Sequence, residues 1–466
     1  MTHDRTESGF KDRTRVAEAR ERLLERVVPH GRTERLPLTE ADGRVLASTV
    51  TAPRAVPGYD RAAMDGWAVR ARDTFGASDR SPAVLRAVET EDDDTRPPVG
   101  PQEAVRVHTG SELPSGANAV VKIERTERVG TEIEIDDAVA EGENVGDRGE
   151  DVNQGQHLYD AGHRLRPSDL GLLQSVGVDS VEVREPPTVS VIPTGEELVE
   201  SDPDPGEIIE TNGLTVSRLV ERWGGDATYR DIVTDDPDAL REAIQRDTDH
   251  DIVVTTGGSS VGERDLVPEV VSELGEVFVH GVALKPGHPV ALGTAGDTPV
   301  LMLPGYPVAC LVNAVQFLRS ATRRAGGLPS APLPTERATL ARKVASEPGE
   351  RTFVRVRLDR SSETGDATSG DDTERGEATS AGRSEATSAG RREATSAGRG
   401  EAASGDAGTT GASGSSGLPT AAPTRASGAG VLSSVALSDG WVVVPEPREG
   451  IDAGETVSVE LWEGSS

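Results

Sequence analysis

The spacing of apolar residues divides the chain into stretches that predict different secondary structures. In residues 12–28 the apolar positions recur at helical intervals, and Pro29 ends the run. Residues 65–140 hold short segments of alternating apolar and polar residues, separated by Gly, Pro and Asp. This alternation predicts a small β-rich domain. Residues 141–186 are rich in glycine and carry one predicted helix near 167–176.

From residue 187 onward, apolar segments of strand length alternate with segments of helical periodicity. The predicted strands include TVSVI, ATYRDIV, DIVV, VFVHGVAL and PVLM, and predicted helices lie at 212–223, 237–247 and 265–274 and from 307 onward. Alternation in units of this size predicts a doubly wound, mostly parallel sheet. The expected fold class is therefore multidomain, α/β plus β, with a central doubly wound α/β domain and flanking β-rich domains.

Residues 361–430 interrupt this order with repeats of EATSAGR and few large apolar residues, so a disordered insertion is expected there. Strand-like patterns stand before it, in TFVRVRLD, and after it, in GWVVVPE and ETVSVELW, so it interrupts one β domain. Four domains are expected: an N-terminal linking domain (12–50 and 141–186), a β-rich lid-like domain (51–140), an α/β domain (187–328) and a C-terminal β domain (329–466) that contains the insertion.

Composition adds a strong acidic bias. The formal net charge is −31, from 80 acidic and 49 basic residues, and only four of the basic residues are lysines. The negative electrostatic field of such a chain repels nucleic acid and anionic membranes, so neither is an expected partner. Because the Debye length falls to roughly 3 Å in molar salt, an acidic and lysine-poor chain points to a halophilic cytoplasm. The single cysteine, Cys310, excludes an internal disulfide, and no apolar leader or span of membrane length is present.

Residues suited to ligand binding lie in the loops that follow the predicted strands, which is where open α/β sheets bind ligands. These loops read PTGEEL, TDD, TTGGSSVGERD, KPGHP and LPGYP. Glycine permits close approach of a ligand to the backbone, and Pro307 suits the first turn of a helix whose N–H groups face an anion. The glycines concerned are Gly257, Gly258, Gly287 and Gly305.

The same loops carry hard oxygen ligands and a lysine. Carboxylates of the kind that Mg²⁺ prefers stand at Glu197, Asp235 and Asp265. Lys285 is one of four lysines in a chain that otherwise prefers arginine, which suggests a point charge in a confined space. Each feature alone has a plainer interpretation: Asp265 as a helix cap, the glycine pair as a turn, and Lys285 as a solvated charge.

Taken together, five such loops on one sheet edge favour a phosphorylated ligand with a metal. No Walker A motif and no GxGxxG is present, so neither a P-loop NTPase nor a Rossmann dehydrogenase fits. Two further Gly- and Pro-rich segments lie outside this domain, VPGYDRAAMDGWAVRARD at 56–73 and VHTGSELPSGANAVVKIE at 107–124. On their own these segments are equally compatible with structural turns.

As a set, these segments resemble the molybdopterin molybdenumtransferase family, to which the E-domain of gephyrin belongs. The matching motifs, in the family's order, are PGYDRAAMDGWAV, HTGSELPSGANAVV, GENVGDRGEDV, PTGEEL, TTGGSSVGERD, KPGHP and LPGYPVA. The resemblance implies an enzyme that inserts molybdate into adenylylated molybdopterin and releases AMP to form the molybdenum cofactor. It also implies Mg²⁺ dependence and a homodimer whose active site lies between the α/β domain of one subunit and residues 51–140 of the other.

The resemblance also assigns roles to individual residues. The implied catalytic residues are Asp65, Glu197, Asp235, Asp265 and Lys285, of which Glu197, Asp235 and Asp265 would hold the metal. The implied substrate-binding residues are Thr109, Thr194, Gly257, Gly258, Ser259, Ser260, Pro304, Gly305 and Pro307. The implied molybdate ligands are Lys285, His288, Arg355 and Ser433.

Three departures from the family pattern bear on the oxyanion. The family often has lysine in place of His288 and serine in place of Ala309, and the insertion lies between Arg355 and Ser433. Molybdate and tungstate therefore both stay open as substrates. Two other functions also stay open: a molybdopterin adenylyltransferase, which is typically a single domain, and a non-enzymatic scaffold like gephyrin. A molybdopterin adenylyltransferase is a further candidate partner.

Overall fold

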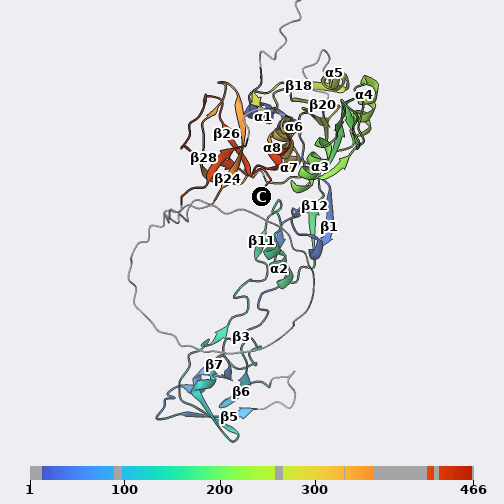
Figure 1. Cartoon of the computed structure of the whole chain (residues 1–466). Coiled ribbons are helices and arrows are strands. Elements are labelled where there is room, and N and C mark those ends of the chain that lie inside the picture. Colours follow the sequence, from blue (N-terminus) through green and yellow to red (C-terminus); the bar gives the residue numbers. More distant parts are fainter. Residues whose placement is uncertain are drawn as a thin grey trace, which may run out of the picture.

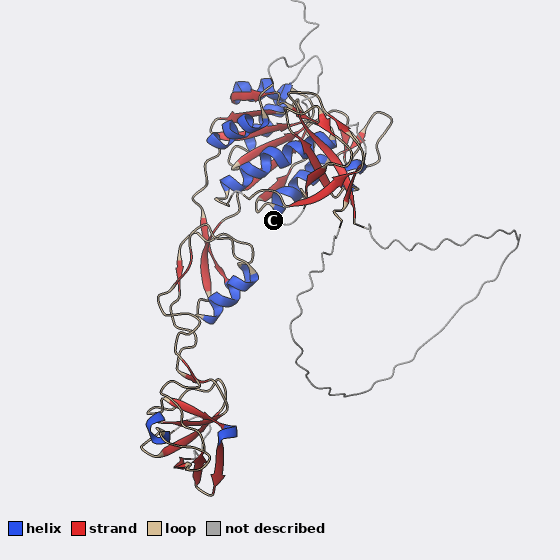
Figure 2. Ribbon diagram, turned by 90° about the vertical axis from the view of Figure 1, so that its left-hand side faces the viewer, coloured by secondary structure: helices blue, strands red, loops and turns tan. Residues whose placement is uncertain are grey.

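The computed structural model describes residues 13–88, 97–257, 266–329, 331–360, 417–424 and 430–463. The molecule is elongated, with three bodies following one another along its length (Figures 1 and 2). The upper body holds an α/β sheet and a second, C-terminal sheet. A linking body follows, and a β-rich distal body lies at the far end. Among the described helices, none is both long and apolar enough to cross a membrane.

The chain passes through the linking body twice, so its strands pair across long sequence separations. Strand β1 (Thr33–Pro37) pairs antiparallel with β12 (Ser180–Arg184), and β2 (Val50–Thr51) with β11 (His157–Tyr159). Helix α2 (Pro167–Ser175) packs beside them, and a small core forms around Leu46 and Leu173. The pair β3 (Arg61–Ala62) and β10 (Val145–Gly146) leads on to the distal body.

The distal body is built on one six-stranded sheet in the order β7-β4-β6-β5-β9-β8. Its strands are β4 (Gly66–Val69), β5 (Ala83–Val88), β6 (Glu103–Val107), β7 (Ala119–Lys122), β8 (Thr126–Val129) and β9 (Glu132–Ile135). Gly66 is required at its position, because a Cβ there would lie 1.9 Å from the carbonyl oxygen of Val121 on the neighbouring strand.

The α/β sheet has the strand order β16-β13-β17-β21-β20-β18. Neighbours from β16 to β21 pair in parallel, whereas β20 pairs antiparallel with both β21 and β18. The strands are β13 (Thr188–Pro193), β16 (Asp226–Tyr229), β17 (Ile252–Thr256), β18 (Gly275–His280), β20 (Ala291–Ala295) and β21 (Thr298–Leu303). The short pair β14 (Leu198–Val199) and β15 (Ile208–Ile209) extends from it.

Helices cover both faces of this sheet, because alternate residues of its buried strands point to opposite sides. On one face Val189 and Val191 share a core with α1, α3, α6 and α7, and on the other Ile192 shares a core with α4 and α5. The helices are α1 (Val16–Arg26), α3 (Asn212–Arg222), α4 (Pro237–Arg246), α5 (Leu266–Leu274), α6 (Pro307–Asn313) and α7 (Arg319–Ala325). A π-helical turn, Ala314–Leu318, joins α6 to α7.

The C-terminal strands close into a ring. Each of β24, β25, β22, β28 and β26 pairs with the next, and β26 pairs back onto β24. Their bounds are β22 (Thr335–Leu340), β24 (Arg351–Asp359), β25 (Thr420–Pro423), β26 (Gly440–Val444) and β28 (Thr456–Glu460). Beside them lie the pair β23 (Val344–Ala345) and β27 (Gly450–Ile451), and the helical turn α8 (Ser433–Ala436).

Strand β25 corrects the expected extent of the disordered insertion. Residues 417–424 fall inside the predicted 361–430 segment, yet they include a strand that pairs with both β22 and β24. The sequence TAAP is short and made of small residues, so its pattern gave no strand signal, and barrel closure determines its conformation. The coarser expectation, a multidomain α/β chain with several β-sheets, is confirmed.

A buried carboxylate ties helix α4 to two strands of the α/β sheet. The Asp247 side chain is fully buried and accepts hydrogen bonds from Ser190 Oγ (2.7 Å), Arg230 Nε (3.0 Å) and Arg246 Nη2 (3.1 Å). Burial alone would raise the pKa of Asp247, but the hydrogen bonds from the arginines and the serine outweigh it and lower the pKa to about 2.

We expect Asp247→Asn to destabilise the α/β body by about 1.5–3 kcal/mol at neutral pH, the range for hydrogen bonds to charged groups. Because the folded pKa lies below the unfolded value of about 3.9, this stabilisation is present above that value and is lost as the pH falls towards 2. Hydrogen exchange of the β13 amides would measure it. The exposed Asp249→Asn is the control, and equal exchange in the two variants would contradict the assignment.

Candidate active site

Topology brings the predicted loops to one edge of the α/β sheet. The carboxyl ends of β13, β17 and β21 share this edge because the three strands are parallel. Strand β18 points the same way, since it is antiparallel to β20, which is itself antiparallel to β21. The segments PTGEEL, TDD, KPGHP and LPGYP therefore emerge side by side.

The strand ends at this edge approach one another closely. Gly257 has a φ of 127°, and a Cβ there would lie 2.0 Å from the Thr194 carbonyl oxygen, so only glycine fits. A Cβ on Gly305 would lie 3.4 Å from the Gly257 Cα. Thr194 is buried, and its Oγ1 has no hydrogen-bond partner within the described part of the chain. Three predicted neighbours, Gly258, Ser259 and Ser260, lie outside the described residues.

Acidic groups gather at the same edge. Burial raises the pKa of Asp235, and the charge of Glu197 raises it further. The buried Oδ1 of Asp235 has no hydrogen-bond partner among the described residues. Asp265, the third predicted metal ligand, lies outside them, and within the described ranges no group of three or more His, Cys, Asp or Glu is placed to hold a metal ion. Glu197 and Asp235 thus form a partial acidic cluster, in which the charge of one carboxylate disfavours ionisation of the other.

Lys285 lies on a segment shared by two sheets. Leu284 and Lys285 form strand β19 (Leu284–Lys285), which pairs in parallel with β24 of the C-terminal barrel, with Lys285 opposite Thr352. The Lys285 Nζ lies 2.9 Å from Glu347 Oε1, on the turn between β23 and β24. This lysine lowers the pKa of Glu347 through its hydrogen bond and its charge. Glu347 could not be identified from the sequence, because no local pattern links it to Lys285.

The other predicted molybdate ligands lie near the same strands. His288 is half-buried, and burial lowers its pKa, as do the charges of Arg13 and Lys285. Arg355 is buried on β24, three residues beyond the partner of Lys285, and burial lowers its pKa. Ser433 is exposed at the start of α8, next to Ser434, whose carbonyl accepts a hydrogen bond from Thr424.

Asn313 fixes the lysine-bearing loop to helix α6. Its fully buried side chain donates from Nδ2 to the carbonyl oxygens of Gly287 (2.9 Å) and Ala309 (2.8 Å). A Cβ on Gly287 would lie 2.2 Å from this Nδ2, so the glycine is required for the contact. Sequence analysis also missed Asn313, although an amide inside the apolar run VACLVNAV is a detectable signal.

A second amide reaches the LPGYP loop. Asn212, the first residue of α3, donates from Nδ2 to the Gly305 carbonyl (2.7 Å), and Glu210 accepts the Gly213 N–H (2.7 Å). Pro304 is buried, whereas Pro307 is the first residue of α6. The segment ETNG carries residues that favour helix starts, so this position could have been found from sequence.

Asp65 and Thr109 form a separate group in the distal body. The Asp65 Oδ1 accepts hydrogen bonds from the Thr109 N–H (2.7 Å) and Oγ1 (2.9 Å), and these two bonds lower the pKa of Asp65. The two side chains are exposed. The distal body lies at the opposite end of the molecule from the α/β sheet (Figure 1). Within one chain, the structure therefore does not bring Asp65 to Lys285 or Asp235.

Three family models match the chain. The MoeA N-terminal region (domain I and II) matches residues 14–177, the "Probable molybdopterin binding domain" matches 190–324, and the MoeA C-terminal region (domain IV) matches 412–462. A molybdopterin biosynthesis protein of Methanocaldococcus jannaschii is 33% identical over 454 residues, which cover 95% of each chain. Molybdopterin molybdenumtransferase 2 of Mycobacterium tuberculosis is 33% identical over 363 residues, covering 74% of this chain and 88% of that one.

Solved structures agree with these matches. A molybdopterin biosynthesis MoeA protein from Pyrococcus horikoshii superposes with a TM-score of 0.75 at 31% identity, covering 97% of this chain and 100% of that chain. A second structure of the MoeA protein from this organism gives a TM-score of 0.69 at 27% identity. The likeness extends over the linking, distal, α/β and barrel parts together.

Asn313→Ala should loosen the lysine-bearing loop, because the buried Gly287 carbonyl would lose the Asn313 amide and keep only the Val290 N–H at 3.3 Å. The net loss of such a hydrogen bond costs about 0.5–1.5 kcal/mol. We expect faster hydrogen exchange in residues 281–290. The matched control is Gln316→Ala, which removes an amide from the same helical run but breaks a contact with Arg20 instead. Equal exchange of 281–290 in the two variants would show that Asn313 does not hold this loop.

Proposed function

Because this chain belongs to the MoeA family of molybdopterin molybdenumtransferases, we propose its reaction in full: it inserts molybdenum into molybdopterin during molybdenum cofactor biosynthesis, using molybdate and adenylylated molybdopterin and releasing AMP. The observation that carries this proposal is the edge of the α/β sheet. The glycine-lined strand ends and the acidic pair lie there, and the segment that carries Lys285 follows β18, whose carboxyl end faces the same edge.

Each group has a distinct task in this proposal. The Thr194, Gly257 and Gly305 backbone, with Gly258, Ser259, Ser260, Pro304 and Pro307, would receive the phosphorylated part of the substrate. Lys285 would pair with the oxyanion through Nζ, replacing its present contact with Glu347. His288, Arg355 and Ser433 would complete the oxyanion site.

The described carboxylates fit a divalent cation. The buried Oδ1 of Asp235 has no hydrogen-bond partner among the described residues, and the pKa of Asp235 is raised beside Glu197. A cation would relieve this unfavourable concentration of negative charge. We propose that Glu197, Asp235 and Asp265 hold Mg²⁺. Such an ion would supply charge neutralisation at the pyrophosphate whose P–O–P bond is cleaved.

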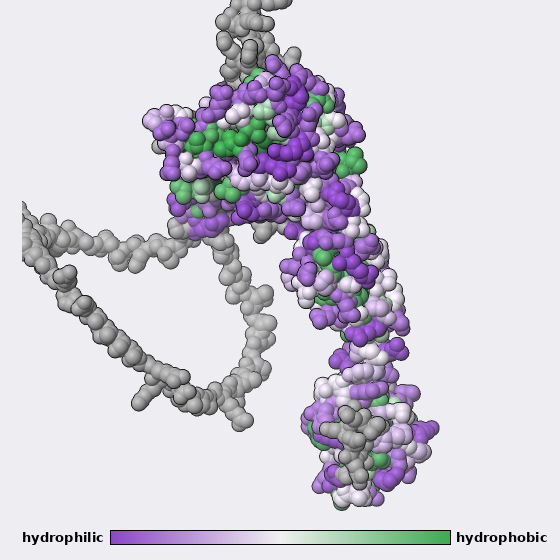
Figure 3. Space-filling view, turned by 90° about the vertical axis from the view of Figure 1, so that its right-hand side faces the viewer, coloured by the Kyte–Doolittle hydropathy of each residue, from purple (hydrophilic) through white to green (hydrophobic). Residues whose placement is uncertain are grey.

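The separation of Asp65 from the α/β edge supports a homodimer in which a second copy completes the site. Exposed apolar side chains also flank the α/β edge: Ile208, Ile209 and Leu214 near α3, Tyr306 before α6, and Leu432 and Leu437 around α8. On the face shown in Figure 3, hydrophobic residues gather mainly on the upper body, and most of the surface around them is hydrophilic. A C2 dimer would bury such a surface.

We also propose that the α/β sheet is doubly wound, that the protein is adapted to a cytoplasm of molar salt, and that a molybdopterin adenylyltransferase is its partner.

We expect Lys285→Ala to lower kcat/KM for molybdate by about 10²–10³-fold, the range for removing one group that stabilises developing charge. AMP release would be followed in molar KCl with Mg²⁺, molybdate and adenylylated molybdopterin. The matched control is Lys343→Ala, since Lys343 also pairs with a carboxylate, Asp452 at 2.8 Å, but lies outside strand β19.

Other outcomes separate the alternatives. Adenylylation of molybdopterin from ATP by the wild type would favour the adenylyltransferase, and no turnover with either oxyanion from folded protein would favour a scaffold. Equal loss of activity in the two lysine variants would contradict the special role of Lys285.

If the site is shared between two copies, Asp65→Asn and Lys285→Ala subunits should complement each other. Random exchange would make half of the dimers mixed, each with one intact site, so activity should return to about a quarter of the wild-type value. Asp65→Asn mixed with Thr109→Val is the control, because both changes damage the same half-site. Mixed dimers that stay inactive would contradict a shared site.

A further inference from the structure

A cavity of about 190 Å³ lies where the linking body meets the α/β body. Its wall includes Pro186 and Pro187, which lead from β12 into β13, and Gly225 and Gly326, which follow helices α3 and α7. It therefore lies at the amino end of β13, the opposite edge of the sheet from the proposed active site. None of the residues assigned to the reaction lines it.

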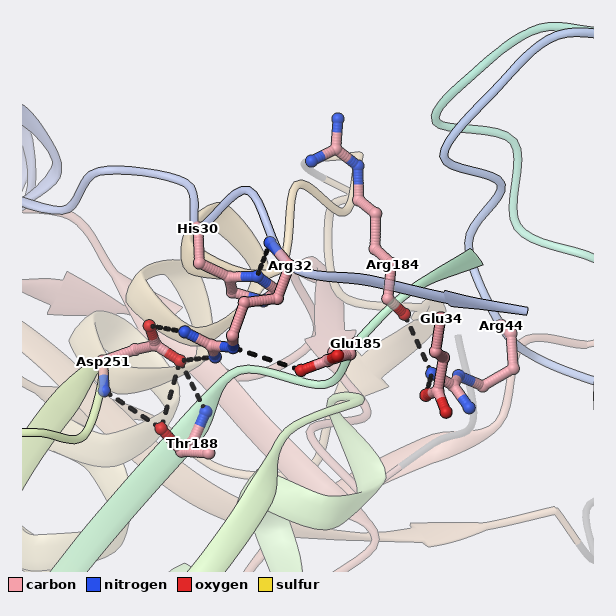
Figure 4. A network of polar contacts seen from close by, with 8 residues as sticks. All are labelled: His30, Arg32, Glu34, Arg44, Arg184, Glu185, Thr188 and Asp251. Carbon is pink, nitrogen blue, oxygen red and sulfur yellow. Dashed lines mark hydrogen bonds and ion pairs between the residues drawn. The ribbon is translucent and has the colours of Figure 1, made fainter. Parts of the chain in front are cut away.

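Three arginines of the linking body line this cavity. Arg44 donates to Glu34 and to the carbonyl of Arg184, and Arg164 Nε donates to the Gly43 carbonyl (3.1 Å). The Arg184 guanidinium has no hydrogen bond or ion pair with any described residue, and its Nε is buried. Figure 4 shows it pointing away from the contacts around Asp251, with no interaction drawn from it.

The carboxylates of the wall do not neutralise Arg184. Glu185 pairs with Arg32 (3.3 Å), which also holds Asp251, and Glu221 pairs with Arg218 (2.7 Å). Neither Arg32 nor Arg218 lines the cavity. Both acids of the wall are thus matched by arginines outside it. Arg44 is matched in turn by Glu34, so the excess positive charge of the wall rests on Arg184.

A further buried arginine shows the same excess. Arg323 on α7 is 5% exposed, and its pKa is lowered to about 10 by burial and by the charges of Arg319 and Arg164. Its Nε and Nη2 both donate to the Pro329 carbonyl, and no carboxylate of the described residues forms an ion pair with it. An anion in the cavity would relieve this repulsion, in a chain whose overall charge is −31.

Capping of helix α7 does not explain why the Arg184 guanidinium lies at this position. The Arg184 guanidinium packs over Gly327, just past the end of α7, since a Cβ there would lie 2.9 Å from its Nε. However, the terminal carbonyls of α7 already accept N–H groups: Thr322 from Gly326, and Arg323 from Leu328. A cation at this end gains from the helix dipole but finds no open acceptor.

We propose that this cavity binds a small inorganic oxyanion of the phosphate class, held chiefly by Arg184 with support from Arg44 and Arg164. The volume is below the roughly 300 Å³ at which drug-sized ligand pockets begin, which suits an ion rather than a nucleotide. The planar guanidinium matches a tetrahedral oxyanion with paired N–H groups. Because the arginines come from the linking body and the glycine wall from the α/β body, a bound anion fixes the junction between them.

Inorganic phosphate is the probe, titrated into the full-length protein by calorimetry at constant ionic strength set with KCl. We expect saturable binding whose affinity falls by at least about tenfold in Arg184→Gln. In Arg184→Lys, which keeps the charge but loses the paired N–H groups of the guanidinium, the affinity should fall less. Arg35→Gln is the matched control, because Arg35 lies on the same ribbon but bonds Ser180 Oγ outside the cavity. Phosphate should also slow hydrogen exchange of β1 and β12 in the wild type and in Arg35→Gln.

Two results would overturn the proposal. One is the absence of saturable binding by the wild type, and the other is equal phosphate affinity in the wild type and both Arg184 variants. Phosphate can also stabilise proteins in general by being excluded from their surface. Equal stabilisation of all variants without a saturable binding isotherm would therefore count against the site. The readouts do not use turnover, so failure of this proposal and failure of the proposed reaction are distinguishable.

Discussion

The backbone pairing of β19 with β24 is the constraint on which the arrangement of the site depends. The segment after β18 leaves the α/β sheet and adds an edge to the C-terminal barrel, where the Arg351 N–H donates to the Ala283 carbonyl (2.9 Å). Because a buried backbone group that loses its partner is costly, the two sheets cannot separate without breaking this contact. Lys285 is therefore positioned by the barrel as well as by the α/β sheet, and Asn313 fixes the following glycine from the other side.

Charge is distributed unevenly across the α/β body. At the carboxyl edge of the sheet, Glu197 and Asp235 lie together and raise the cost of ionising Asp235. At the amino edge, arginines crowd one another, and Arg323 has a lowered pKa. Each excess is of the sign that a ligand would compensate, a cation at one edge and an anion at the other. In an acidic chain, the arginine excess is the less expected of the two.

The Asp65 carboxylate of the distal body is oriented by contacts within that body alone. Thr109 orients the Asp65 carboxylate through two hydrogen bonds, and Gly66 lets the neighbouring strands approach at that point. This geometry is complete within the distal sheet, yet it stands far from the α/β edge in the same chain (Figure 1). A second copy, related by symmetry, is the simplest means of bringing the two halves of the family's motif set together.

The sequence by itself determined the features that local periodicity encodes. The TVSVI segment predicted strand β13, and the succession of strands and helices placed most of the predicted loops at one sheet edge. The motif set also identified the family, because those loops carry its residues in order. These properties follow from neighbours in the chain, so they can be read without the fold.

Only the tertiary structure decided the contacts between distant segments. The pairing of Lys285 with Glu347 and the hydrogen bond from Asn313 to Gly287 join residues far apart in sequence, and no periodic pattern links them. The Arg184 guanidinium, which pairs with no described residue, likewise follows from the fold. Strand β25 was missed for a related reason, since four small residues become a strand only when the barrel closes around them. The separation of Asp65 from the α/β edge likewise depends on how whole bodies are connected, which hydrophobic spacing does not encode.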